Sequence, residues 1–113
     1  MQILRARAIK VKSPLQTKIV FWLLFVRSRG ATNRITIMSA LRKRPRNRNQ
    51  LSTELGIEYK VIQHHLKVLE KNNLVRKIGN HYGVIYFVST LFENSEFVFD
   101  EIVAKLNKVS DKK

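Results

Sequence analysis

The stretch Asn47-Arg-Asn-Gln-Leu-Ser-Thr-Glu-Leu-Gly-Ile57, near the middle of the 113-residue chain, carries the local signals that decide the fold. Asn47 and Gln50 have the spacing of a capping box, in which each side chain bonds the backbone N–H of the other residue. This spacing predicts a short helix over 48–55, whose two leucines would face the core. Gly56 then supplies the turn that ends it.

A longer helix is predicted directly after this turn, over 58–73. Glu58 suits the positive N-terminal end of a helix dipole, and Ile62, Leu66 and Leu69 recur at the spacing of one buried helical face. At 100° per residue, the opposite face collects hydrogen-bond donors and one aromatic ring, namely Tyr59, Lys60, Gln63, His64, Lys67 and Lys71.

Two short strands are predicted next, over 75–78 and 84–88, and the five residues 79–83 between them have the composition of a hairpin turn. Two helices joined by a glycine turn and followed by a hairpin make a winged helix-turn-helix, which is a mainly α fold with a small β-hairpin wing (α+β). Its second helix fits the DNA major groove, which is wide enough for one helix. The same arrangement could also pack without touching DNA and bind only proteins.

Three further helices complete the expected domain. Ser13 and Pro14 favour a helix over 14–28, ended by Gly30. A second helix is expected from residue 32 or 33 to Lys43, and the last over 95–108. Because a chain of this length has room for one core, we expect a single domain over 14–110. Residues 1–13 then form a basic tail, either an edge strand or an arm.

The first helix is apolar on two faces. One stripe at helical spacing is formed by Leu15, Ile19, Trp22 and Val26, and the other by Phe21, Leu24 and Phe25. A domain this small covers one helix face, and each Phe ring left in water would forgo roughly 1.5–3 kcal/mol of burial. We therefore expect a second subunit to cover Phe21, Leu24 and Phe25, the alternative being a helix sunk centrally in its own core.

Positive charge is concentrated in the first half of the chain. The net charge is +14, and residues 1–53 hold 13 basic residues and no acidic one. A field this one-sided attracts polyanions, so double-stranded DNA is the leading partner and an anionic membrane surface the second. A protein that coats DNA without sequence preference is the alternative to a regulator.

The apolar run over 19–26 follows a basic N-terminus, as in a signal peptide. Eight helical residues rise about 12 Å, however, against the ~30 Å of a bilayer core. Arg27 and Arg29 follow the run at once, and no small-residue cleavage site is present. We therefore expect a cytoplasmic protein that does not enter a membrane.

The segment Leu55–Val75 resembles the helix-turn-helix core of ArsR-like winged-helix transcriptional regulators, particularly their archaeal branch. Residues 44–51 match that branch's pattern arginine-proline-x-asparagine-x-asparagine-glutamine-leucine, and Tyr82-Gly83 and Tyr86-Phe87 match its wing. The resemblance covers about residues 20–106. It implies a homodimeric DNA-binding repressor or activator joined through its terminal helices, which adds Phe99 and Val103 to the dimer interface.

Helical geometry and the resemblance together assign base contacts to Tyr59, Lys60, Gln63 and His64. The resemblance adds Val61, at the edge of the outer face, where a thymine methyl contact is feasible. Contacts to the DNA backbone or minor groove are expected from the basic loop, the outer helix face and the wing: Arg42, Lys43, Arg44, Arg46, Arg48, Lys67, Arg76, Lys77, Asn80 and His81.

The sequence offers no catalytic or metal-binding pattern. Without cysteine it lacks the thiolate ligands of the metal-sensing members of the family. His64 and His65 diverge by about 100° on a helix and cannot close on one ion. His65 is expected to pack beside Leu69 or to bond a phosphate, and its titration near neutral pH is a candidate switch. We expect no metal, no cofactor and no enzyme activity.

Overall fold

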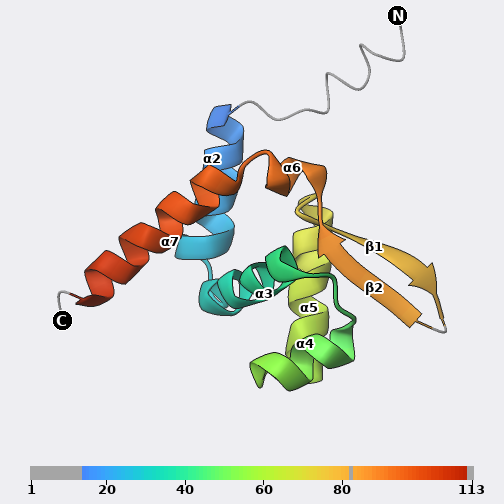
Figure 1. Ribbon diagram of the computed structural model, residues 1–113. Helices are drawn as coiled ribbons and strands as arrows, with labels where there is room; N and C mark the ends of the chain where they lie inside the picture. Colours follow the sequence, from blue (N-terminus) through green and yellow to red (C-terminus); the bar gives the residue numbers. More distant parts are fainter. Residues whose placement is uncertain (1–13, 82, 112–113) are drawn as a thin grey trace, which may run out of the picture.

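The computed structural model describes residues 14–81 and 83–111, so the basic tail over 1–13 and Tyr82 of the wing motif lie outside the described residues. The elements run α2 (Pro14–Trp22), η1 (Leu23–Arg27), α3 (Ala31–Lys43), α4 (Arg48–Leu55), α5 (Tyr59–Lys71), β1 (Val75–Asn80), β2 (Gly83–Val88), α6 (Thr90–Glu93) and α7 (Glu96–Asp111). Figure 1 shows α2 and α7 together on the side of the molecule away from the hairpin, with α3, α4 and α5 between. The predicted winged helix-turn-helix is confirmed.

The first helix has the predicted start but an unpredicted end. It begins at Pro14 and changes at Leu23 into one π-helical turn that ends at Arg27. Gly30 lies beyond this end and takes the left-handed conformation, φ 83°, immediately before α3. A π turn widens the backbone ring and changes which carbonyls are free at the helix end, and one of these carbonyls, that of Leu24, is used below.

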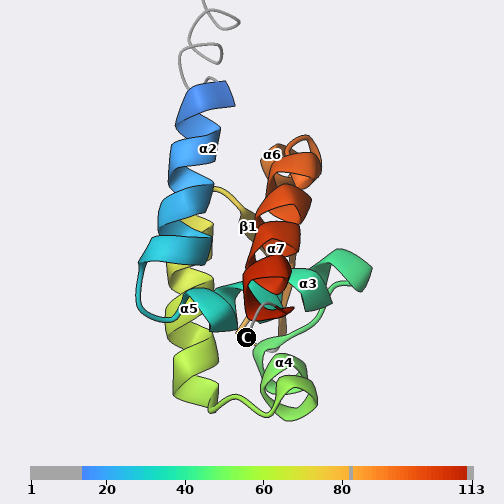
Figure 2. The ribbon, with the colours of Figure 1, turned by 90° about the vertical axis from the view of Figure 1, so that its left-hand side faces the viewer.

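The core is built on four aromatic rings in mutual contact, mostly edge to face. Phe21 and Phe25 of the first helix pack against Phe92 of α6 and Phe99 of α7, with ring centroids 5.1–6.0 Å apart. All four side chains are at most 1 % exposed. In the view of Figure 2, the first helix and α7 stand beside each other, and the aromatic contacts join these two elements.

The expectation that a second subunit covers Phe21, Leu24, Phe25 and Phe99 is wrong, because the chain's own core buries all four. Three residues of the other stripe, Leu15, Ile19 and Trp22, stay in solvent together with Leu23, all about half to two-thirds exposed, while Val26 is half-buried against the core. α6, which was not predicted, brings Phe92 onto the Phe stripe and so decides which face turns inward. Val103 is partly buried against the core.

The helix-turn-helix follows the sequence closely. Asn47 and Gln50 make both bonds of the predicted capping box, with N···O distances of 2.7 and 2.8 Å. Gly56 ends α4 in the left-handed conformation, φ 66°. α5 buries Ile62, Leu66 and Leu69 as expected.

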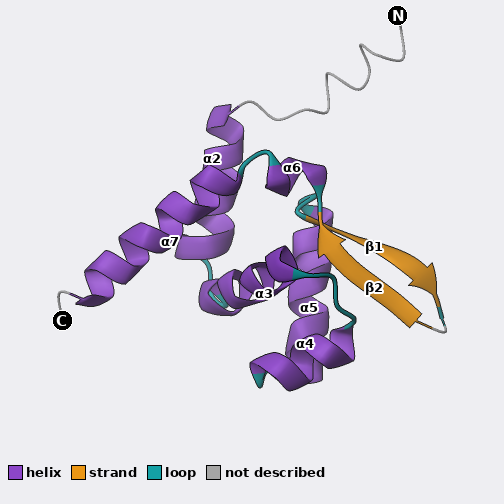
Figure 3. Cartoon of the chain, in the orientation of Figure 1, coloured by secondary structure: helices purple, strands orange, loops and turns teal. Residues whose placement is uncertain are grey.

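The hairpin is longer than predicted, because β1 and β2 stay paired as far as Asn80 and Gly83. The five-residue loop is therefore wrong, and only two residues separate the strands, which Figure 3 shows extending away from the helices. Arg46 adds an isolated bridge to this sheet, since its backbone exchanges two hydrogen bonds with that of Tyr86. The base of the wing is thereby fixed to the segment before α4.

Candidate nucleic-acid interface

The outer face of α5 presents the predicted donors to solvent. Lys60, His64 and Lys67 are exposed, Tyr59 is 38 % exposed, and Gln63 is half-buried. Val61 is also half-buried, at the edge of this face. Buried apolar residues on the opposite side hold the helix against the core, so the donors lie on a rigid support. This geometry is suited to reading base edges in a major groove.

Arg48 links the start of α5 to the wing. Its guanidinium carbon lies 5.9 Å from the ring centre of Tyr59 and 6.0 Å from that of Tyr86. Both distances are within the range of a cation–π contact. A hollow beside it is lined by residues of α4, α5 and the hairpin tip, including Asn49, Asn80 and His81. The structure thus brings together residues expected on bases and on the backbone.

Arg46 has a structural place and not the predicted phosphate contact. Its side chain is 8 % exposed, donates to the backbone oxygens of Ala40 and Arg44, and pairs with Glu54 at 2.7 Å. Nothing in its position presents the guanidinium to a ligand. Arg44 lies 3.5 Å from the same carboxylate, but both of these groups are exposed, and such a pair is weak.

Arg42, which is also predicted to contact the DNA backbone, forms ion pairs with the start of α7. It pairs with Glu96 through Nε and, at 2.6 and 2.9 Å, with both carboxylate oxygens of Asp100. Hydrogen bonding to Arg42 lowers the pKa of Asp100, and the bonds that Arg42 donates to Asp100 are the main cause of a raised Arg42 pKa. This fork joins α3 to α7. The acidic start of the last helix therefore neutralises Arg42.

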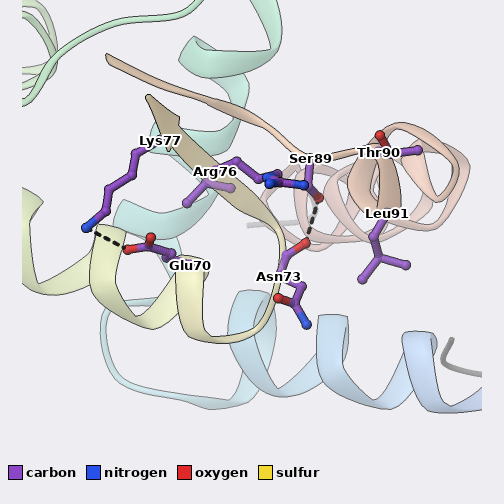
Figure 4. Close-up of a pocket in the computed structure, with 8 residues that line it drawn as sticks. Glu70, Asn73, Arg76, Lys77, Ser89, Thr90 and Leu91 are labelled. Atoms are coloured by element: carbon purple, nitrogen blue, oxygen red, sulfur yellow. Dashed lines mark hydrogen bonds and ion pairs between the residues drawn. The ribbon is translucent and has the colours of Figure 1, made fainter. Parts of the chain in front are cut away.

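The remaining predicted cations stay on the surface. Lys43, Lys67 and Arg76 are exposed, and Lys77 lies 3.5 Å from Glu70 as a half-exposed pair. Figure 4 shows a second hollow at the base of the hairpin, lined by Glu70, Asn73, Arg76, Lys77, Ser89, Thr90 and Leu91. A bond of 2.6 Å from the Ser89 hydroxyl to the Asn73 backbone oxygen closes one side of it.

His65 packs inside the protein, as one of the two predicted roles has it. It is 5 % exposed, and its Nδ1 lies 3.2 Å from Nη1 of Arg34. Burial, and then the charges of Arg34 and His64, lower the pKa of His65. Arg34 is the residue that the sequence analysis missed. An arginine inside an amphipathic helix gives no local signal that its partners lie ten and thirty-one residues away.

Two findings bear on other classes of site. Within the residues described, no group of three or more His, Cys, Asp or Glu is arranged to hold a metal ion. Among the same residues, none of the helices combines the length and the apolar content needed to cross a bilayer.

The comparisons with known proteins place the fold. Residues 32–77 match the model of the arsR family of bacterial regulatory proteins. Among solved structures, Rv0081 of M. tuberculosis is similar with a TM-score of 0.64 and 21 % identity, covering 89 % of this chain and 98 % of its own. HlyU of Vibrio cholerae gives 0.59 and 22 %, with 84 % and 97 % covered.

A third similar structure is the homodimeric winged helix-turn-helix DNA-binding domain Mb0332 of Mycobacterium bovis, described as a possible ArsR-family transcriptional regulator. Its TM-score is 0.62 at 15 % identity, with 92 % and 95 % of the chains covered. No curated protein sequence matches the chain significantly. Residues 32–77 of this chain therefore match the arsR family model, and the chain has the winged helix-turn-helix fold of these solved structures.

Proposed function

We propose that the protein is a sequence-specific transcriptional regulator that binds double-stranded DNA as a homodimer. α5 enters the major groove with Tyr59, Lys60, Gln63 and His64 at base edges, and the wing lies on the backbone or in the minor groove. The observation that carries the proposal is the exposed, donor-rich outer face of α5 within a helix-turn-helix that matches the arsR model.

Backbone contacts come from cations and polar groups on both sides of α5. The exposed or half-buried members are Lys43, Arg44, Arg48, Lys67, Arg76, Lys77, Asn80 and His81. Arg46 is left out because it is buried, and Arg42 because it donates hydrogen bonds to two carboxylates of α7, whereas the ion pairs of Arg44 and Lys77 are longer, at 3.5 Å. If about six phosphates are neutralised per dimer, log K falls with log salt with a slope near −5.

The dimer contact uses the exposed stripe of the first helix, in place of the Phe residues. Leu15, Ile19, Trp22 and Leu23 lie at i, i+4, i+7 and i+8, which is one helical face. Exposed apolar patches of this kind mark interaction surfaces. The similar Mb0332 domain is homodimeric, which supports a second copy as the occupant.

The first test is selection of bound duplexes from a random pool. A two-fold symmetric consensus, with half-sites about one helical turn apart, is expected from a dimeric reader. Selected duplexes without a shared sequence would overturn base readout.

The second test compares two substitutions on α5 against the selected duplex and a random one. Gln63→Ala is expected to cost roughly 1–3 kcal/mol on the selected site only, whereas Lys67→Ala weakens both duplexes alike. Equal effects of the two variants on both duplexes would contradict the assignment of Gln63 to a base.

The second candidate function is a non-specific architectural DNA-binding protein. The acid-free first 53 residues favour it, because backbone charge alone supplies non-specific affinity. A preference below about tenfold for the selected duplex over random DNA would establish this function, since regulators usually reach 10³ or more.

A further inference from the structure

Arg34 of α3 is a buried cation whose described partners include no carboxylate. It is 4 % exposed. Its Nε donates to the Leu24 backbone oxygen at 2.8 Å, its Nη2 to the Ser28 hydroxyl and, at 3.3 Å, to the Arg29 backbone oxygen. The Leu24 oxygen belongs to η1, at the negative end of the helix dipole, and the Arg29 oxygen lies in the turn just beyond it. The charge is therefore balanced by dipoles.

The fourth partner of Arg34 is His65, which belongs to α5. Nη1 lies 3.2 Å from Nδ1 of His65. Arginine carries donors only, so Nδ1 must accept, and His65 is neutral with its proton on Nε2. A Cβ built on Gly30 would lie 2.6 Å from Cε1 of His65. The ring is thus confined between Arg34 and the backbone at Gly30.

We propose that Arg34 is a positioning residue for DNA binding: through neutral His65 it holds α5 against the corner between η1 and α3, and acid releases this hold. The inference rests on the proposed function of α5. Protonation puts a proton on Nδ1, removes the acceptor, and places a second cation against the buried guanidinium. α5 then loses the hydrogen bond that connects it, through Arg34, to the end of η1. The conformation that binds DNA becomes less populated.

The groups that face His65 all oppose its protonation. Arg34 acts from α3 and His64 from α5 itself, with the two imidazole ring centres 5.3 Å apart. The corner between η1 and α3 contributes Gly30 at the ring, while the side chains of Arg27 and Arg29 are exposed. No acidic group of the described chain is among the causes of the lowered His65 pKa.

The direction of the pH effect follows from this environment. A histidine whose pKa is lowered on folding stabilises the folded state fully above its unfolded value of 6.5, and this stability is lost as pH falls. The fraction of protein able to bind DNA falls in the same range. The apparent Kd rises as the inverse of that fraction.

The experiment compares the wild-type chain with His65→Asn, so that the other two histidines, which the proposed function places at the DNA, are present in both chains. The asparagine keeps an acceptor near the position of Nδ1 but does not titrate. At fixed salt, the affinity of the wild-type chain for the selected duplex, relative to that of His65→Asn, is expected to fall about three- to tenfold between pH 7.5 and pH 5.

Equal pH dependence in the two chains would overturn the proposal. A DNA-free readout separates this failure from failure of the proposed function. In the wild-type chain, NMR titration of the His65 ring is expected to give a pKa below 6.5, and the emission of Trp22, the only tryptophan, should change over the same range. A His65 pKa at or above 6.5 would overturn this proposal even if the protein binds DNA as proposed.

Arg34→Gln tests the arginine itself. Glutamine can still donate one bond to Nδ1 but carries no charge, so the His65 pKa is expected to rise toward 6.5 while the fold is kept at pH 7.5. Arg34→Lys is the matched charged variant. It is expected to keep the lowered His65 pKa, and a His65 pKa unchanged in Arg34→Gln would contradict the role of Arg34.

Discussion

At the scale of single residues, Gly30 and Gly56 share the left-handed backbone conformation but differ in the atoms around them. Gly30 and Gly56 have φ values of +83° and +66°, but a Cβ on Gly30 meets the buried ring of His65, whereas a Cβ on Gly56 meets nothing within 4 Å. The strain of an L-residue at positive φ is common to both, at about 1–2 kcal/mol. Only Gly30 adds a steric conflict that displaces a hydrogen-bonded ring.

Gly30→Ala is therefore expected to lower the free energy of unfolding by more than Gly56→Ala. Urea denaturation of the two variants measures the difference, with Gly56→Ala as the control for backbone strain alone. Equal losses would mean that His65 moves aside at no cost. That result would also weaken the confinement on which the pH-dependent link depends.

Arg46 separates a structural arginine from a DNA-contacting one. Because it is buried and bonds two carbonyls and Glu54, Arg46→Met leaves those acceptors unpaired and is expected to cost about 1–3 kcal/mol of stability. Because its guanidinium is buried, we expect no phosphate contact from Arg46, so the salt slope of DNA binding should not change.

Arg48→Met is the matched comparison. It is expected to reduce the salt slope by about 1 for each protomer bound, with a smaller loss of stability. Urea denaturation and DNA titrations at several salt concentrations measure both quantities. A reduced salt slope in Arg46→Met would show that Arg46 contacts a phosphate, contrary to what its burial leads us to expect.

At the scale of elements, helix starts were predictable where a side chain caps its own backbone. The capping box at Asn47 and the proline at position 14 set the starts of α4 and α2 to the residue. Elements that depend on distant contacts were not predictable. The π turn η1 presents the Leu24 carbonyl to an arginine ten residues away, and α6 adds Phe92 to the aromatic core.

The residues of the candidate DNA-binding face also divide into those that the local sequence predicts and those whose role depends on distant partners. The outer face of α5 followed from helical periodicity alone, because one side of that helix is plainly apolar. Both faces of the first helix are apolar, so periodicity could not choose between them. The roles of Arg42 and Arg46 depend on acidic partners 54 and 8 residues further along the chain, and charge counting does not reveal such pairs.

Asn47→Ala tests the energy of the capping box. The substitution leaves the Gln50 backbone N–H without its partner and is expected to cost about 0.5–2 kcal/mol. Asn49→Ala, an exposed position within the same helix, is the control and should change stability by less than about 0.5 kcal/mol. Urea denaturation measures the free energy of unfolding of the two variants. Equal losses would contradict a stabilising role of the capping box at the start of α4.

At the scale of the whole molecule, the proposed surface for DNA and the proposed surface for self-association lie on different elements. α4, α5 and the wing carry the candidate DNA face, while α2 and α7 lie away from the hairpin in Figure 1. The first helix packs its Phe residues inward and leaves an apolar stripe outside. The stripe and the outer face of α5 share no residue, so substitutions can be made in one without altering the other, although the buried contacts from η1 through Arg34 to His65 connect the two regions.

Ile19→Glu, in the middle of the exposed stripe, tests the dimer. Ile19 is 51 % exposed, so the variant should fold, but a carboxylate facing its symmetry mate across an apolar contact must be desolvated, which opposes association. We expect a dimer for the wild type and a monomer for Ile19→Glu by light scattering.

Thr53→Glu introduces the same charge at an exposed position on α4, outside the first helix, and is the control that should stay dimeric. The DNA consequence follows from symmetry. A dimer holds two half-sites at once, so the monomer should lose most of its affinity for the full duplex while keeping the wild-type affinity for an isolated half-site. An Ile19→Glu protein that remains dimeric would move the interface away from α2, and a monomeric wild type bound to an asymmetric site would remove the dimer from the mechanism.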